Sequence, residues 1–306
     1  MENSIWADPA TKPKLDPNIY QLHGDLLLFF KEQTGIQDED ELKQHVLGVQ
    51  AKAYEIFGYP CIRLLTFLQL GISELPGYKH VLSLLEKYPD PILLDIGCCF
   101  GVDVRKVVVD GWPVDKIIGS DIQQGFWDFG HLLFKSTPES FPAGFIVGDA
   151  FDSALIDPES KGLDENAPLP PLNQLKSLSP LLHKISAIHV SSVFHLFSEE
   201  RQRELAGRLL SLLAIRPGSI ILGMHCGLQE AGIWEGLEES NFRMFCHSPN
   251  SWKKLWKDLF KEAGYDEQKV EVDAALLDVK TANPVGSTDE ALPVNWTMLV
   301  WSVKII

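Results

Sequence analysis

The feature that most constrains the fold of this 306-residue chain is an alternation of short apolar runs with helix-like segments, which begins near residue 91. The apolar runs are, in order, PILLDIG, KIIGSDI, FIVGDA, ISAIHVSS and GSIILGM. Such alternation is typical of a parallel β-sheet that helices bury on both faces. Two later runs, EVDAALLDV and WTMLVWSVKI, flank a polar, glycine-containing loop and predict a terminal antiparallel hairpin. We therefore expect an α/β fold.

A helical region precedes the first apolar run. Residues 20–88 show helical periodicity, and Asp38 is expected to cap a helix that stops at the GYP sequence of 58–60. The apolar positions of that helix are Leu42, Val46, Val49 and Ala53. We predict an N-terminal helical cap or lid over residues 1–88 and a ligand-binding domain over residues 89–306.

Two further segments complete the expected organisation. Residues 152–183 contain five prolines and little periodicity, which predicts a surface insertion loop, either a lid or a tolerated connection. A late helix is expected to begin at Ser251.

The charge balance excludes several classes of partner. Lys and Arg number 27 against 42 Asp and Glu, a net charge of −15, which opposes binding to nucleic acid or to anionic membranes. The sequence has neither a long apolar span nor an N-terminal signal pattern, so we expect a cytoplasmic protein. The five cysteines lack metal-ligand spacing, which predicts reduced thiols and no metal.

The sharpest local signal is LDIGCCFG at 94–101, a strand that runs into a tight turn and then a helix. Gly97 and Gly101 permit positive φ, so the turn, with Cys98 inside it, lets the backbone approach a ligand closely. The pattern is neither the dinucleotide fingerprint nor a P-loop. A nucleotide-like ligand without a pyrophosphate is therefore expected.

Acidic residues stand at the ends of three consecutive apolar runs, at Asp95, Asp121 and Asp149. In a doubly wound sheet these carboxylates share the carboxyl edge, where ligands bind. They suit a ligand with an ammonium group, a ribose diol and an exocyclic amine, and they would repel phosphate. We therefore predict S-adenosylmethionine as the cofactor, although each aspartate alone could simply stabilise a turn.

Several motifs resemble the class I S-adenosylmethionine-dependent methyltransferases of fungal meroterpenoid and polyketide biosynthesis. These motifs are YPCIR, GCCFGVDVRKVVVDG, FWDFGHLLF, SSVFHLF and FCHSPNSWKKLWKDL, and the resemblance covers most of residues 20–265. It implies a Rossmann-like fold with a seven-stranded, mostly parallel sheet and methylation of oxygen, often of a carboxyl group. Val102 and Arg63 depart from the family's usual residues.

The resemblance also implies a place for each part of the cofactor. Asp95, Gly97 and Gly101 are expected at its methionine end and Asp121 on its ribose hydroxyls. The residues expected around its adenine are Asp149, Ala150 and Phe151. Ile122 is expected either to pack on the adenine or to belong to the core.

Histidines are the candidates for an acid–base role. Methyl transfer from a sulfonium requires no protein nucleophile, and an ionised carboxylate needs only orientation, whereas a phenol benefits from a base. His195 and His225 follow the fourth and fifth expected strands, so both are predicted catalytic residues. His189, inside the fourth strand, is expected to be a core residue with a backbone partner.

The substrate is expected to be a small apolar acid or phenol. Tyr20, Tyr54, Tyr59 and Phe194 are candidate aromatic walls of its pocket, although aromatic residues at such spacing are usually core. The segment shared with the family suggests Arg243 and His247 on the substrate side. Arg63 either contacts a substrate carboxylate or is only a surface change.

The predicted activity is O-methylation of a secondary-metabolite intermediate, at a carboxyl group or a phenol hydroxyl. Two alternatives stay open at this point. One is an enzyme of the same fold that catalyses a step without methylation, such as cyclisation, and the other is a cofactor-binding regulatory protein. The sequence leaves the oligomeric state open, with a homodimer as one form.

Overall fold

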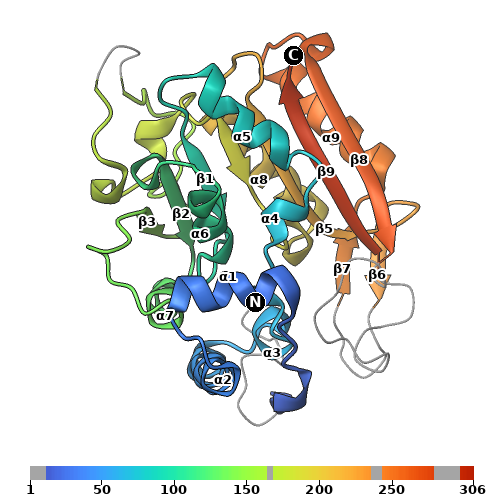
Figure 1. Ribbon diagram of the computed structural model, residues 1–306. Helices are drawn as coiled ribbons and strands as arrows, with labels where there is room; N and C mark the ends of the chain where they lie inside the picture. Colours follow the sequence, from blue (N-terminus) through green and yellow to red (C-terminus); the bar gives the residue numbers. More distant parts are fainter. Residues whose placement is uncertain (1–11, 164–167, 236–242, 279–296) are drawn as a thin grey trace.

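A seven-stranded sheet forms the centre of the protein (Figure 1). The computed structural model describes residues 12–163, 168–235, 243–278 and 297–306. The strands are β1 Leu93–Ile96, β2 Ile117–Asp121, β3 Gly144–Val147, β4 Ala187–His189, β5 Ile220–Gly227, β8 Val270–Asp278 and β9 Thr297–Ile305, in the order β3-β2-β1-β4-β5-β9-β8. β1 to β5 are parallel, and β9 is antiparallel to β5 and β8. The predicted fold is confirmed, while the polar loop of the hairpin lies outside the described residues.

Helices cover both faces of this sheet. The helices are α1 Gly24–Thr34, α2 Glu39–Ile56, α3 Pro60–Arg63, α4 Gly71–Glu74, α5 Tyr78–Lys87, α6 Val102–Val109, α7 Gln124–Leu133, α8 Glu199–Leu212 and α9 Pro249–Glu262. Short 3-10 helices lie at Pro17–Ile19, Thr66–Leu68, Val114–Lys116, Leu172–Gln174, Ser179–Leu181, Phe194–Leu196 and Glu267–Lys269. One hydrophobic cluster joins α5 and α6 to one face, and another joins α8 and α9 to the opposite face. Burial on both faces explains why the strands are apolar throughout.

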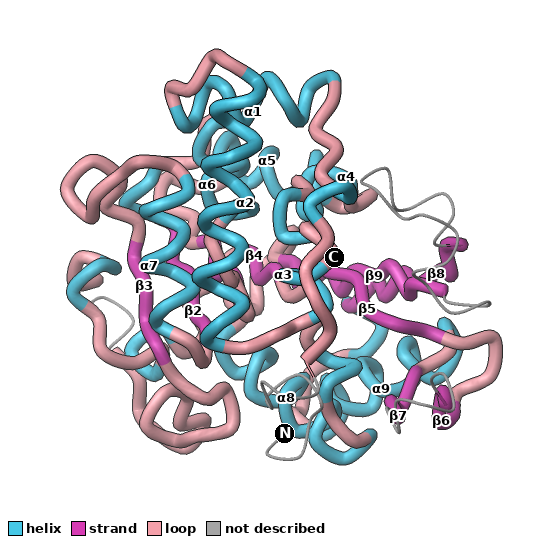
Figure 2. The backbone as a smooth tube through the Cα atoms, turned by 90° about the horizontal axis from the view of Figure 1, so that it is seen from below, coloured by secondary structure: helices cyan, strands magenta, loops and turns pink. Residues whose placement is uncertain are grey.

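The helices α1, α2 and α3 form a cap at the end of the sheet where the parallel strands finish (Figure 1). As predicted, the Asp38 side chain caps α2, since it accepts the Glu41 N–H at 2.9 Å. Seen from below, α2 lies beside α7 (Figure 2). Gly125 of α7 lies against Ile56 of α2, since a Cβ there would be 2.4 Å from Cδ1 of Ile56 and this side chain would have to move. The apolar interior of the cap reaches Phe100, in the turn between β1 and α6.

The boundary between the helical cap and the sheet domain, which the sequence pattern places at residue 88, is crossed by the packing of α5. Tyr78, Val81 and Leu84 of α5 pack with Leu93 and with other residues of the sheet. α5 therefore belongs structurally with the sheet. The division at residue 88 stays a prediction, and this packing favours a boundary near residue 70.

Of the segment between β3 and β4, residues 152–163 and 168–183 are described, and they pack on the sheet. The segment's leucine and isoleucine side chains in the core are Leu155, Ile156, Leu172, Leu175, Leu178, Leu181 and Leu182. Backbone atoms of Leu172 lie 3.0 Å from the place where Gly144 would carry a Cβ. The expected surface loop is thus corrected for these residues, because their apolar side chains fill the place of a crossover helix.

Three local features differ from the sequence expectations or add to them. β6 Gly232–Glu235 and β7 Arg243–Cys246 form an additional two-stranded sheet. α9 begins at Pro249 rather than at Ser251, because Ser248 is the N-cap and Ser251 completes a capping box. In the part of the chain that the structure describes, no helix is both long and apolar enough to cross a membrane.

Candidate active site

The turn after β1 is shaped by two glycines at the carboxyl edge of the sheet. Gly97 has φ +72° and Gly101 has φ +64°. A Cβ on Gly97 would lie 2.5 Å from Cγ2 of Val193, and one on Gly101 would lie 2.6 Å from the Trp127 ring. Larger residues therefore fit neither position, and the backbone stays bare where a ligand can approach.

Cys98 lies in the same turn but faces the core. Its side chain is 7% exposed and packs with Trp127, and its Sγ would be 2.8 Å from a Cβ on Gly119. Its N–H also donates to the Ser120 carbonyl. The structure therefore gives Cys98 a packing role, in contrast to the predicted cofactor contact.

Asp121 is held rigidly at the end of β2. Its Oδ2 accepts the Cys99 N–H and its Oδ1 accepts the Gln123 N–H, both at 2.9 Å. Burial raises the pKa of Asp121, although these two N–H groups oppose the shift. The adjacent Ile122 is 49% exposed. A fixed carboxylate beside an open apolar surface suits a ribose and an aromatic base.

Asp149, Ala150 and Phe151 follow β3 at the same edge. Asp149 is exposed and accepts the Phe151 N–H at 2.9 Å, so its carboxylate shapes the turn. The Phe151 ring packs edge-on against Phe197, with the Arg201 guanidinium 3.6 Å above it. This aromatic side chain is therefore fixed at the end of the third strand.

Asp95 is 3% exposed and pairs with a histidine of the neighbouring strand. Nδ1 of His189 lies 2.8 Å from Oδ1 of Asp95, and its Nε2 lies 2.7 Å from Oγ of Ser191. The expectation of a backbone partner for His189 was wrong. Burial by itself lowers the pKa of His189, but the carboxylates of Asp95 and Asp103 outweigh it, and the net shift is upward.

Sequence reasoning missed Ser191 and Asp103 altogether. Ser191 lies two residues beyond His189, just after the end of β4, and Asp103 lies in the first turn of α6. Their positions could have identified them from the sequence, since both are polar residues close to the carboxyl edge of the sheet.

His195 is partly exposed and uncharged near neutral pH. Burial lowers the pKa of His195 to about 4. Its Nδ1 accepts the Cys226 N–H at 3.4 Å, so the ring proton resides on Nε2. His195 therefore offers an N–H donor rather than a proton acceptor at Nε2.

His225 lies inside an aromatic cluster rather than at the open edge. Its Nδ1 accepts the Trp301 indole N–H at 3.0 Å, and Phe194 and Trp252 pack against its ring. His225 is 1% exposed and Phe194 is fully buried. Burial lowers the pKa of His225 well below its usual range. Both residues are core, so their predicted catalytic and substrate roles are corrected.

Arg243 and His247 are also placed away from an open pocket. Arg243 is exposed on β7 and forms an ion pair with Glu235 at 2.9 Å. His247 is 2% exposed, and its Nδ1 lies 2.9 Å from Oγ of Ser251. A direct substrate contact therefore finds no support for either side chain.

The cap residues divide into structural and site-facing groups. Tyr54 is buried, and its hydroxyl donates to the Pro13 carbonyl at 2.6 Å, which ties it to the N-terminal segment. Tyr59 is half-buried, and burial, with the nearby Asp121 carboxylate, raises its pKa to about 12. Arg63 is half-buried at the end of α3. Tyr59 is thus the cap aromatic that reaches the predicted cofactor site.

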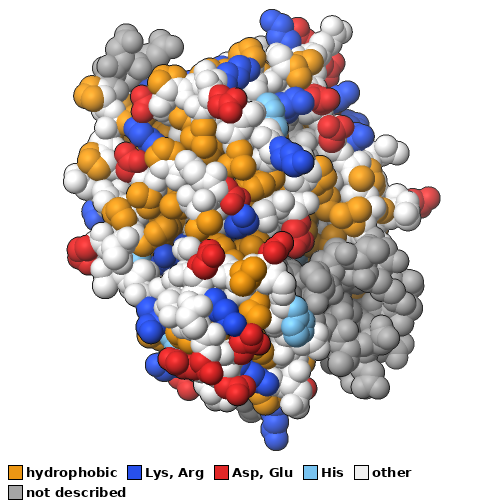
Figure 3. All heavy atoms as spheres, in the orientation of Figure 1, with side chains coloured by type: hydrophobic (Ala, Val, Ile, Leu, Met, Phe, Trp, Pro, Cys, Tyr) orange, Lys and Arg blue, Asp and Glu red, His pale blue; other side chains and the backbone are white. Residues whose placement is uncertain are grey.

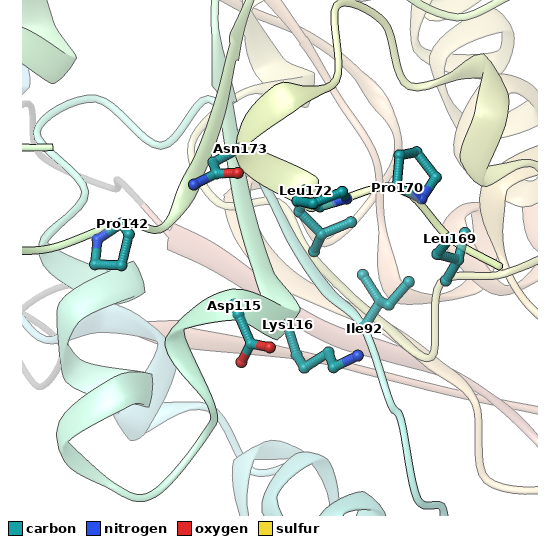
Figure 4. A pocket seen from close by; sticks show the side chains of 9 residues that line it. Ile92, Asp115, Lys116, Pro142, Leu169, Pro170, Leu172 and Asn173 are labelled. Carbon is teal, nitrogen blue, oxygen red and sulfur yellow. The ribbon is translucent and has the colours of Figure 1, made fainter. Parts of the chain in front are cut away.

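A cavity of about 430 Å³ lies at the opposite edge of the sheet (Figure 4). It is lined by Ile92 and Lys116, which precede β1 and β2, and by residues 169–173. Asp95 and Asp121 stand at the other ends of these strands, so this cavity is separate from the candidate site.

The described surface and side chains show two further properties. On the face drawn in Figure 3, Lys and Arg are interspersed with Asp and Glu over the described residues, and no continuous basic track forms there. No group of three or more His, Cys, Asp or Glu side chains with metal-binding geometry occurs among the described residues.

The comparisons with known proteins agree with this geometry. Residues 14–68 match a family described as the meroterpenoid methyltransferase N-terminal domain. The chain is 33% identical to O-methyltransferase phiE of a fungal species (strain ATCC 74256), over 74% of this chain and 67% of that protein. It is 30% identical to methyltransferase ausD of Aspergillus calidoustus, over 82% and 83% of the two chains. Identity to the Asnovolin E/Chermesin D methyltransferase nvfJ of Aspergillus novofumigatus is also 30%, over 73% and 72%.

Among solved structures, a DhpI–SAH complex resembles the chain with a TM-score of 0.41 and 12% identity, over 86% of this chain and 96% of that one. The strand order and the glycine turn after β1 are those of a Rossmann-like class I methyltransferase fold. The methyltransferase relatives add the activity and its methyl donor, S-adenosylmethionine. The chain belongs to the meroterpenoid methyltransferases of fungi.

Proposed function

We propose that the protein transfers a methyl group to the carboxylate oxygen of a small, apolar meroterpenoid acid. The observation that carries this proposal is the state of His195, whose low pKa and Nε2 proton make it a poor base but a suitable hydrogen-bond donor. An ionised carboxylate needs no base, whereas a phenol does. The similarity to phiE, an O-methyltransferase by name, supports oxygen as the acceptor atom.

The charge and the backbone geometry of the residues at the carboxyl edge support S-adenosylmethionine as their ligand. The bare backbone at Gly97 and Gly101 admits the methionine end beside Asp95, and the fixed carboxylate of Asp121 suits the ribose hydroxyls. The open surface for the adenine consists of Ile122, Asp149, Ala150 and Phe151. The bound donor supplies an electrophilic methyl group.

The protein contributes alignment and the exclusion of water. In this proposal the Nε2–H of His195 donates to the acceptor carboxylate and orients one of its oxygens toward the methyl group. Tyr59 and the cap close the site from the other side, which lowers the local dielectric and favours a displacement in which opposite charges neutralise. Arg63, at the end of α3, is a candidate second contact for the acid.

Methyl-labelled S-adenosylmethionine distinguishes the candidate functions. The protein is incubated with labelled donor and matched pairs of apolar terpenoid acids and phenols, and each product is then treated with mild alkali. Label that alkali releases as methanol identifies an ester and supports the proposal. Alkali-stable label on a phenol contradicts it. An unlabelled rearranged product indicates cyclisation, and donor binding without any product indicates a regulatory protein.

A further inference from the structure

A chain of hydrogen bonds crosses three neighbouring strands directly beneath the proposed cofactor site. The Met224 N–H of β5 donates to Oγ of Ser191 at 3.2 Å, and Oγ lies 2.7 Å from Nε2 of His189. Nδ1 of His189 lies 2.8 Å from Oδ1 of Asp95 on β1. His189 is 2% exposed and Asp95 3% exposed, so solvent does not compete for these contacts.

The chemistry of the four groups fixes the direction of the bond to Asp95, whether His189 is neutral or protonated. A carboxylate only accepts, so the Nδ1–H of His189 donates to Asp95. Oγ of Ser191 already accepts from Met224, so in the neutral ring its own proton points to Nε2 of His189, whereas in the protonated ring Nε2–H donates to Oγ. This arrangement holds His189 in one tautomer and one ring orientation, because every ring nitrogen has a partner.

The Asp95 carboxylate therefore has only one of its two oxygens hydrogen-bonded to His189. Oδ1 of Asp95 is bound to His189, whereas Oδ2 has no hydrogen-bond partner among the described residues. Asp95 directly precedes Ile96 and the glycine turn, beside which the methionine end of the donor is proposed. Asp103 on α6 also lies within electrostatic reach of the Asp95–His189 pair, and Glu74 on α4 within reach of Asp103.

We propose that His189, supported by Ser191, is a positioning residue that aims the free oxygen of Asp95 at the ammonium group of the methyl donor. This inference rests on the proposed placement of the cofactor. Ser191, His189 and Asp95 are connected in the order of a hydrolytic triad. In a triad the serine contacts the substrate, whereas in this proposal the carboxylate contacts the ligand.

The test compares two ligands that differ only at the methionine end. S-adenosylhomocysteine carries the amino acid group, whereas 5′-methylthioadenosine keeps the nucleoside and lacks that group. Calorimetry measures both affinities for the wild type, His189→Leu and His189→Asn. We expect His189→Leu to lower the affinity for S-adenosylhomocysteine by about tenfold or more, as expected for loss of a charged hydrogen bond. The affinity for methylthioadenosine should stay within about twofold of the wild-type value. His189→Asn should restore most of the loss, since its amide N–H replaces Nδ1–H.

Matched variants separate this role from a structural one. Asp121→Ala serves as the control, because loss of a ribose contact should weaken both ligands. If His189→Leu does not fold, Ser191→Ala provides the same comparison, with a smaller loss of about threefold that is confined to S-adenosylhomocysteine. The inference is overturned if the His189 or Ser191 variants lose affinity for both ligands equally, or lose affinity for neither. A wild type that binds neither ligand overturns the proposed function as well.

Discussion

Oδ1 of Asp103, in the first turn of α6, accepts the backbone N–H of Ile72 at 3.0 Å, which ties α4 to the helix after the glycine turn. Burial raises the pKa of Asp103 to about 6, and the neighbouring Asp95 adds to the shift. Because the unfolded carboxyl titrates near its usual value of 3.8, the folded chain binds this proton more tightly. Stability from this group is therefore greatest at low pH and declines as the pH rises through about 6.

This relationship predicts the effect of Asp103→Asn on the ligand-free protein. We expect the variant to melt higher than the wild type at pH 8, by about 2 °C or more, because it removes an ionised, half-buried group while the amide oxygen still accepts from Ile72. At pH 4.5 the difference should shrink, since Asp103 is then largely protonated. Thermal unfolding at both pH values gives the comparison, and a difference independent of pH would contradict this account.

The glycine turn makes a second prediction, with a control in the same chain. Gly97→Ala should destabilise the protein and abolish donor binding, because a Cβ would lie 2.5 Å from Val193 and the residue has φ +72°. Gly48→Ala should instead stabilise by up to about 1 kcal/mol, since Gly48 lies inside α2 with no atom within 4 Å of a new Cβ. Denaturant unfolding and calorimetry measure both effects, and equal behaviour of the two variants would refute the steric argument.

Asp121 predicts the strength of the ribose contact. Asp121→Ala should weaken the binding of S-adenosylhomocysteine by roughly 1–3 kcal/mol in free energy, because it removes charged hydrogen bonds to the ribose. The substitution also frees the Cys99 N–H, so the adjacent turn loses one of its anchors. Calorimetric titration provides the measurement, and an unchanged affinity would contradict the assignment of Asp121.

The pH profile of methyl transfer is expected to be flat. With donor saturating, kcat for a carboxylic acid acceptor should vary little between pH 6 and 9, since burial keeps the pKa of His195 at about 4 and the acceptor is already ionised. His195→Phe should lower kcat by about tenfold, as expected for loss of one hydrogen bond to a charged group, without adding a titration. Steady-state rates across this range test both statements, and a rise in kcat centred near pH 7 would indicate a general base instead.

Much of the architecture was predictable because it depends on local patterns. The alternation after residue 91 predicted the strands from β1 to β9 that build the large sheet, and Asp38 marked the start of α2. The glycine turn and the three strand-end aspartates were likewise visible, since turn geometry and strand polarity are short-range properties. The predicted contact roles of the aspartates remain predictions.

The sequence by itself determined which segments become strands, helices and turns, because hydrophobic periodicity and backbone sterics act over a few residues. Only the tertiary structure decided that His189 meets Asp95, 94 residues earlier, and that His225 is enclosed by Trp252 and Trp301. These outcomes depend on which side chains share one interior, and that is set by the packing of distant segments. Local patterning carries no information about such partners. A histidine near the end of a strand has the same local sequence pattern whether it lies in the core or at a functional site.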